Sequence, residues 1–158
     1  MCRLLFCILI CVSFCNASKA SKAINLNAYN KLFVKYGKLH KIPPELLWGI
    51  AKTESELNPK AVGVNPNGTK DRGLMQVNSI HEAELKKRNL TLDDLFDPEI
   101  NVKYASEVLA KCFDKHGFTW QGLNCYNGRI KNNSYHLRVL KNIKDNRKAV
   151  VKKVVILK

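Results

Sequence analysis

Apolar residues at helical spacing, separated by prolines and glycines, constrain the fold of this chain most strongly. The clearest run lies between Pro98 and Gly117, where apolar residues recur every three or four positions. This spacing places them on one face of a helix, and proline and glycine are common at the two helix ends. The same pattern predicts helices over 26–40, 45–55, 81–89, 120–126 and 135–148, a helix start at Thr91, and a loop over 57–72. Strand signals are few, so the sequence predicts a mainly α fold.

The N-terminus has the pattern of a segment that is removed. Arg3 precedes an apolar run from Leu4 to Phe14, and small residues stand at the −3 and −1 positions of a cut after Ala17. This pattern predicts a signal peptide over residues 1–17 and export of the rest. A cut after Ala20 and an uncleaved anchor remain alternatives. The run is shorter than the roughly 20 apolar residues of a membrane-spanning helix.

Export affects how the cysteines and the charge are interpreted. Only Cys112 and Cys125 would remain after cleavage, and an oxidising compartment favours a disulfide between them over two buried thiols. The chain has 27 Lys and Arg against 13 Asp and Glu, a net charge of +14, which implies an anionic partner or substrate.

We expect one domain over 18–143 and a mobile basic tail over 144–158. A strand or a membrane-surface segment is the alternative for the tail.

Glu54 is the strongest candidate for acid–base chemistry. It follows Leu47 and Ile50 at helical spacing and shares their apolar face. Burial disfavours the charged carboxylate, so we expect a raised pKa and a retained proton near neutral pH. A general acid needs that proton. A solvated glutamate at a helix end is the alternative interpretation.

Several short motifs then follow one another along the chain. They are Glu54-Ser55, Gly73-Leu74-Met75-Gln76-Val77-Asn78, Asp97-Pro98-Glu99-Ile100-Asn101 and Cys125-Tyr126-Asn127-Gly128. In this order the sequence resembles the lytic transglycosylase family, in its soluble catalytic-domain branch, from Ile42 to Val139. Its small size and export signal resemble the compact members that accompany bacterial secretion, conjugation and pilus machines.

The resemblance implies a lysozyme-like single domain, of the goose-type and lytic transglycosylase kind, with a glycan-binding cleft. It implies cleavage of the bond between N-acetylmuramic acid and N-acetylglucosamine in peptidoglycan, with the muramic acid's own 6-hydroxyl as nucleophile and 1,6-anhydro ends as product. Most glycosidases use two carboxylates, whereas an internal nucleophile makes one sufficient. By resemblance, Glu54 is catalytic, and the substrate-binding residues are Ser55, Met75, Gln76, Asn78, Tyr126, Asn127 and Tyr135.

The resemblance also sets expectations about surroundings and partners. It implies no cofactor and no metal, and the four histidines lack metal-ligand spacing. We expect a periplasmic monomer that acts on peptidoglycan strands and that works beside secretion or pilus components. Two departures from the family bear on the cleft: Gly63 stands where relatives often carry Ser, and the loop over 64–72 is longer than usual.

Other functions remain to be weighed. The basic charge suits a nucleic-acid binder, but export and the lack of a basic–aromatic motif argue against one, and the anionic cell wall explains the charge. A membrane-active basic domain and a non-catalytic glycan-binding scaffold are further alternatives. A water-using lysozyme would need a second carboxylate. Asp71 is the candidate for it, although its loop position and its neighbour Arg72 favour a structural role.

Overall fold

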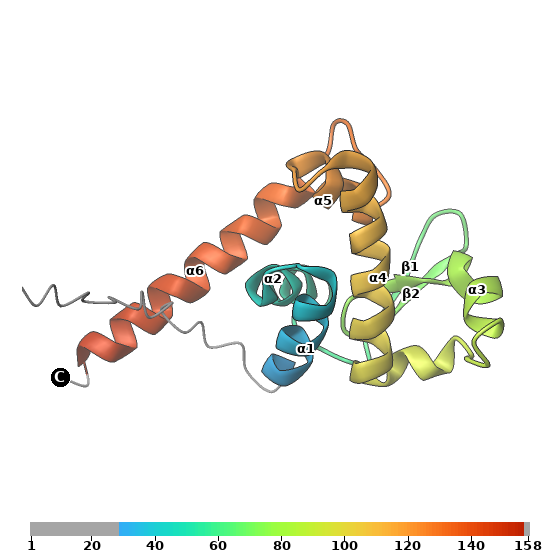
Figure 1. The fold of residues 1–158 in the computed structure, drawn as a ribbon, viewed down its shortest axis with the longest axis horizontal. Coiled ribbons are helices and arrows are strands. Elements are labelled where there is room, and N and C mark those ends of the chain that lie inside the picture. The colour runs from blue at the N-terminus through green and yellow to red at the C-terminus, as the bar shows by residue number, and fades with distance from the viewer. Residues whose placement is uncertain (1–28, 157–158) are drawn as a thin grey trace, which may run out of the picture.

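The computed structural model describes residues 29–156, which form a mainly α domain with a small sheet (Figure 1). The signal peptide predicted at residues 1–17 lies outside the described residues, as do both cleavage positions. The α-helices are α1 (Asn30–His40), α2 (Pro44–Ser55), α3 (Glu82–Lys86), α4 (Pro98–His116), α5 (Trp120–Tyr126) and α6 (Tyr135–Ile156). Short 3-10 helices occupy Ser79–His81 (η2) and Asp93–Phe96 (η3). The predicted mainly α class is confirmed.

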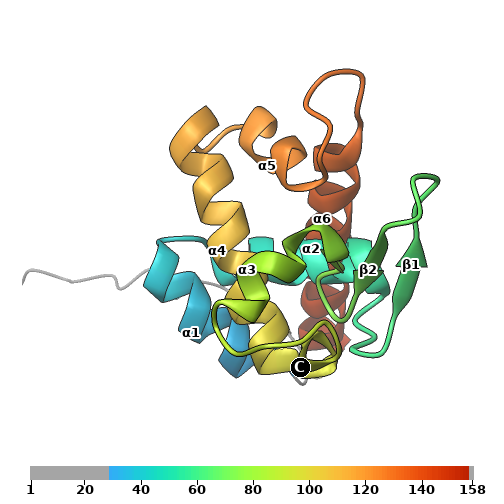
Figure 2. The same ribbon diagram turned by 90° about the vertical axis from the view of Figure 1, so that its right-hand side faces the viewer.

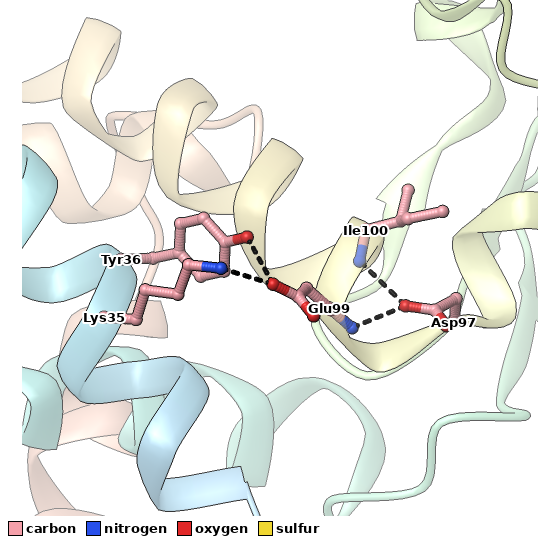
Figure 3. Close-up of polar contacts among 5 residues, drawn as sticks. All are labelled: Lys35, Tyr36, Asp97, Glu99 and Ile100. Atoms are coloured by element: carbon pink, nitrogen blue, oxygen red, sulfur yellow. Dashed lines mark hydrogen bonds and ion pairs between the residues drawn. The ribbon is translucent and has the colours of Figure 1, made fainter.

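The start of α4 is fixed both locally and by α1 (Figure 3). The Asp97 carboxylate accepts hydrogen bonds from the backbone N–H groups of Glu99 and Ile100, at 2.8 and 3.0 Å. Such a cap satisfies donors that have no partner within the helix. The Glu99 carboxylate in turn accepts hydrogen bonds from the Lys35 ammonium and the Tyr36 hydroxyl of α1. The first turn of α4 is therefore joined to α1.

Helix α2 lies at the centre of the core and packs against both α1 and α6. Leu47 and Ile50 are fully buried. A side chain at Gly49 would collide with Ile143 of α6, so the two helices approach closely at this glycine. Near the end of α2, the Thr53 hydroxyl accepts a hydrogen bond from the Asn142 amide at 2.9 Å. These contacts fix the position of the turn that carries Glu54.

A three-stranded antiparallel sheet lies beside the helices in the order β1-β2-β3, formed by Val62–Val64, Lys70–Arg72 and Val77–Asn78. The prediction of a loop over 57–72 is therefore wrong at β1 and β2. These strands are too short to produce a recognisable alternation of apolar and polar residues. The turn between them is closed by the hydrogen bond from the Asn65 N–H to the Thr69 carbonyl, at 2.9 Å.

Helix α6 continues well past the predicted domain end at residue 143. It reaches Ile156, so residues 144–156 are a continuation of the helix and the expected boundary is not a break in structure. The chain after Gly128 contains no glycine or proline that would interrupt a helix. Lys141 and Asp145 form an ion pair one turn apart that supports it. Mobility of this segment stays a prediction.

No helix within residues 29–156 has the length and hydropathy to span a membrane.

Candidate active site

A cleft of about 590 Å³ is lined by residues of the sheet, of η2 and of helices α4 and α5. Figure 2 shows how the β1–β2 hairpin, α4 and α5 are arranged. One wall consists of the β1–β2 hairpin, β3 and η2, and the other consists of α4, α5 and the residues that follow α5. Glu54, in the last turn of α2, also lines this cleft. The predicted site residues that line it are Glu54, Gln76, Asn78, Tyr126 and Asn127. Most of the candidate site therefore surrounds one cavity.

The environment of Glu54 favours its protonated form. Burial raises the pKa of Glu54 from 4.5 to about 7, and the charge of Asp71 acts in the same direction. The Tyr135 hydroxyl and the Arg138 guanidinium lower the pKa, but burial dominates. The carboxyl also lies at the C-terminal end of α2, where the helix dipole disfavours a negative charge. Glu54 is thus poised to give and to take a proton near neutral pH.

Two tyrosines lie near Glu54 and remain neutral. Burial raises the pKa of Tyr126 and of Tyr135 well above its usual value. The Tyr126 hydroxyl donates a hydrogen bond to the Met75 carbonyl at 2.7 Å, which joins α5 to the segment before β3. The fully buried Tyr135 hydroxyl is close enough to Glu54 to affect its pKa, yet it makes no hydrogen bond of standard geometry with any described residue. Tyr135 therefore lies beneath the cleft surface.

The segment from Gly73 to Gln76 is held by a buried asparagine of α4. Gly73 has a φ of +78°, and a side chain there would collide with the Leu95 carbonyl and the Asn101 amide. The Asn101 side chain accepts a hydrogen bond from the Met75 N–H at 2.8 Å. Its amide donates to the carbonyls of Arg72 and Leu95, at 2.9 and 2.8 Å. The sequence placed Asn101 in a motif without a role, and the structure shows that it anchors this turn.

Met75 does not line the cleft, contrary to the prediction. Its side chain is 0% exposed and belongs to the hydrophobic core, as is usual for methionine. Its contribution to the site is the backbone carbonyl that receives the Tyr126 hydrogen bond. Ser55 also does not line the cleft, and its hydroxyl donates to the Leu74 carbonyl at 2.6 Å. The side chains of Ser55, Met75 and Tyr135 therefore support the site from behind.

Gln76 presents only one end of its amide to the cleft. The side-chain NH₂ group donates to the carbonyls of Ala61 and Gly73, at 3.1 and 2.8 Å. The oxygen accepts no hydrogen bond from the part of the chain that the structure describes, so it can serve as an acceptor. A Cβ atom at Gly63 would lie 3.1 Å from this oxygen, closer than side-chain carbons usually approach. Gly63 therefore leaves space around the Gln76 oxygen.

Asp71 lies in the cleft on β2. Its two carboxylate oxygens accept hydrogen bonds from the side-chain amides of Asn78 and Asn65, at 2.6 and 2.9 Å. The expected loop position is wrong, because Asp71 lies in strand β2, and pairing with β3 brings it to the cavity that Glu54 lines. A structural role for Asp71 stays a prediction. Asn78 is both a cleft residue and a partner of this carboxylate. Two carboxyl groups thus share one cavity.

The predicted disulfide is present and joins Cys112 of α4 to Cys125 of α5. Cys125 precedes Tyr126, so the cross-link holds the helix that supplies one cleft wall. Within residues 29–156, no cluster of three or more histidine, cysteine, aspartate or glutamate side chains has the arrangement of a metal site.

Sequence comparison gives these features a family context. The family model "Transglycosylase SLT domain" matches residues 31–148. This chain belongs to the transglycosylase SLT family. The SLT protein is 37% identical over 101 residues to "Invasion protein IagB" of Salmonella typhi, which covers 63% of each chain. It is 38% identical over 144 residues to a "Peptidoglycan-binding-like protein" of Escherichia coli O157:H7, covering 79% of the SLT protein and 86% of that relative. The SLT protein thus spans about 63% of the length of IagB.

A solved structure of the same family has a similar fold. The 70 kDa soluble lytic transglycosylase SLT70 of Escherichia coli matches with a TM-score of 0.55 and 26% sequence identity. The match covers 78% of the SLT protein and 22% of SLT70, so the similarity concerns one part of the larger enzyme. The family and the lysozyme-like fold expected from the motifs are confirmed.

Proposed function

We propose that this SLT protein is a peptidoglycan lytic transglycosylase that cleaves the β-1,4 bond between N-acetylmuramic acid and N-acetylglucosamine. The observation that carries the proposal is the position of Glu54. Its carboxyl group lines a cleft of about 590 Å³, and its pKa of about 7 suits both proton donation and proton acceptance. Family membership supports the reaction class. Gln76, Asn78, Tyr126 and Asn127 supply the polar surface against which a glycan would bind.

The reaction proceeds by two proton transfers through Glu54. Protonated Glu54 gives its proton to the glycosidic oxygen as the bond from that oxygen to C1 of muramic acid breaks. The 6-hydroxyl of the same sugar then attacks C1, and the Glu54 carboxylate takes the proton from this hydroxyl. A C1–O6 bond replaces the broken bond, so the product is a 1,6-anhydro end and no water is consumed. Holding the 6-hydroxyl next to C1 accelerates the second step through proximity.

A water-using lysozyme is the second candidate, and the position of Asp71 favours it. Enzymes that hydrolyse glycosides commonly use two carboxyl groups that flank the scissile bond. Asp71 lines the same cleft as Glu54, and its charge raises the pKa of Glu54. The amides of Asn65 and Asn78 fix the orientation of the Asp71 carboxylate. In this alternative the product carries a reducing end instead of an anhydro end.

Mass analysis of the products distinguishes the two reactions. Purified peptidoglycan is incubated with the wild-type protein, with Glu54→Gln and with Asp71→Asn. Anhydro-ended muropeptides, lighter by one water than reducing ones, are expected from the wild type and absent with Glu54→Gln. Reducing ends that disappear with Asp71→Asn would instead establish the lysozyme. No product from a folded wild type would refute both candidates and leave a glycan-binding scaffold.

We further propose that the protein acts in the periplasm and opens the wall locally for an envelope-spanning secretion, conjugation or pilus machine. The similarity to a protein named as an invasion protein supports this setting, as does the signal-peptide pattern of residues 1–17. Cell fractionation tests the export step. The expected result is a periplasmic protein whose mature N-terminus begins at Ser18. A full-length protein in the cytoplasm would refute export.

A further inference from the structure

His81 is a cleft residue that the proposed reaction does not use. It ends η2 and lines the cavity together with Glu54. Its partly buried ring lies edge-on to the ring of Tyr104 in α4, with the ring centres 5.3 Å apart and an angle of 64° between the planes. Tyr104 is itself buried, and the Arg88 guanidinium lies over its ring at 5.1 Å. This packing fixes the orientation of the imidazole at the cleft wall.

The imidazole of His81 is neutral and its nitrogens are available. Burial lowers the pKa of His81, and the positive charge of Lys111 lowers it further, whereas Glu84 acts in the opposite direction. Neither ring nitrogen forms a hydrogen bond with a described residue, and neither is enclosed, in contrast to the enclosed Nε2 atoms of His40 and His116. A neutral imidazole offers one donor and one acceptor. Within residues 29–156, no other group occupies the donor or the acceptor nitrogen of His81, so both can bind a ligand.

The cleft that His81 lines also carries apolar residues on η2 and α4. The neighbouring Ile80 side chain is 69% exposed and lines the cleft. Val108 and Ala105 of α4 line it as well. An acetamido group combines a methyl group with one N–H donor and one carbonyl acceptor, so a cleft that offers both apolar residues and a neutral imidazole matches it. A plain hydroxyl would leave the apolar surface unused.

From this arrangement we propose that His81 is a substrate-binding residue that recognises the acetamido group of an N-acetylated sugar in the cleft. The proposal rests on the proposed function, because it assumes that the cleft binds glycan strands. Glu54 is not among the charges that affect His81, and His81 is not among those that affect Glu54. In this proposal His81 acts on binding, and the proton transfers of Glu54 proceed without it.

Two substitutions at His81 separate a binding role from a packing role. His81→Phe keeps an aromatic edge against Tyr104 but removes the donor and the acceptor. His81→Gln loses the ring but keeps both. With soluble uncross-linked glycan strands, His81→Phe should raise KM three- to tenfold, the range of one hydrogen bond, while kcat stays within about twofold. His81→Gln should remain closer to the wild-type KM. The reverse order would show a packing role and overturn the proposal.

Direct binding identifies the group that is recognised. In the Glu54→Gln background, which prevents cleavage, the dissociation constant is measured for N-acetylchitohexaose and for cellohexaose, which lacks acetamido groups. His81→Phe should weaken binding of the first and leave the second unchanged. An equal change for both, or none for either, overturns the proposal. If the folded wild type neither cleaves strands nor binds N-acetylchitohexaose, the proposed function is refuted as well. If the wild type is active and His81→Phe binds N-acetylchitohexaose as tightly as the protein with His81, only the role of His81 is refuted. Should His81→Phe fail to fold, His81→Leu against His81→Gln provides the same comparison.

Discussion

The replacement of Glu54 by glutamine should stabilise the protein, and only at high pH. The pKa of Glu54 rises from 4.5 to about 7 on folding, so between these values the folded state holds a proton that the unfolded state has lost. Glu54 therefore does not lower the free energy of unfolding below pH 4.5, and it lowers this free energy progressively as pH rises towards 7. At about 1.4 kcal/mol per pKa unit, the loss is about 3 kcal/mol above pH 7. This is an upper limit, because the side chain is only partly buried.

Glutamine has nearly the shape of glutamate and no charge, so it avoids this loss. The assay is thermal unfolding followed by circular dichroism at pH 4, 6 and 8. Glu54→Gln should match the wild type at pH 4 and unfold several degrees higher at pH 8, by up to about 10 °C for 3 kcal/mol in a domain of this size. Glu56→Gln is the matched control, because Glu56 is an exposed neighbour and should change stability by less than about 0.5 kcal/mol. A difference between wild type and Glu54→Gln that does not vary with pH would refute the reasoning.

Further predictions concern activity and the cleft walls. The cleavage rate at low substrate should fall about tenfold per pH unit above pH 7, as Glu54 loses its proton; a flat profile up to pH 9 would contradict the assignment of the acid. Tyr126→Phe should cost about 1–3 kcal/mol in urea unfolding, because the Met75 carbonyl loses its partner, and an unchanged midpoint would show that water replaces the hydroxyl. Reduction of the Cys112–Cys125 bond should lower the free energy of unfolding by about 3 kcal/mol in the same assay; equal curves with and without reductant would refute a stabilising role.

The long helices were predictable because each carries its own signals. Helix α4 begins at the predicted proline and ends beside the predicted glycine, since nineteen residues give enough turns for the apolar spacing to be read. Glu54 was identified by the same spacing. The β1–β2 hairpin was missed, because three-residue strands contain too few residues to show a period. Helix α6 was predicted too short, because interleaved lysines and valines are compatible with several structures.

The errors within the site have tertiary causes. Met75 and Gln76 are adjacent in a motif, but Gln76 adopts a φ of +51°, and this turn sends one side chain into the core and leaves the other at the cleft. Asp71 reaches the cleft through its place in the sheet, where it pairs with both β1 and β3. Asn101 acts on Met75 from 26 residues away. The local spacing of residues in the sequence does not predict such long-range contacts.

The two walls of the cleft differ in how firmly they are held to the rest of the domain. The α5 wall is cross-linked to α4 and bonded to the segment before β3 through Tyr126, whereas the opposite hairpin consists of three-residue strands with Val62 and Val64 exposed. Amide hydrogens of the hairpin should therefore exchange through local opening, well before those of α5. No residue of β1 or β2 belongs to the buried hydrophobic core, so substitutions there should leave the core intact. Evolution can thus reshape the entrance of the cleft at this wall while the helix that carries Glu54 remains unchanged.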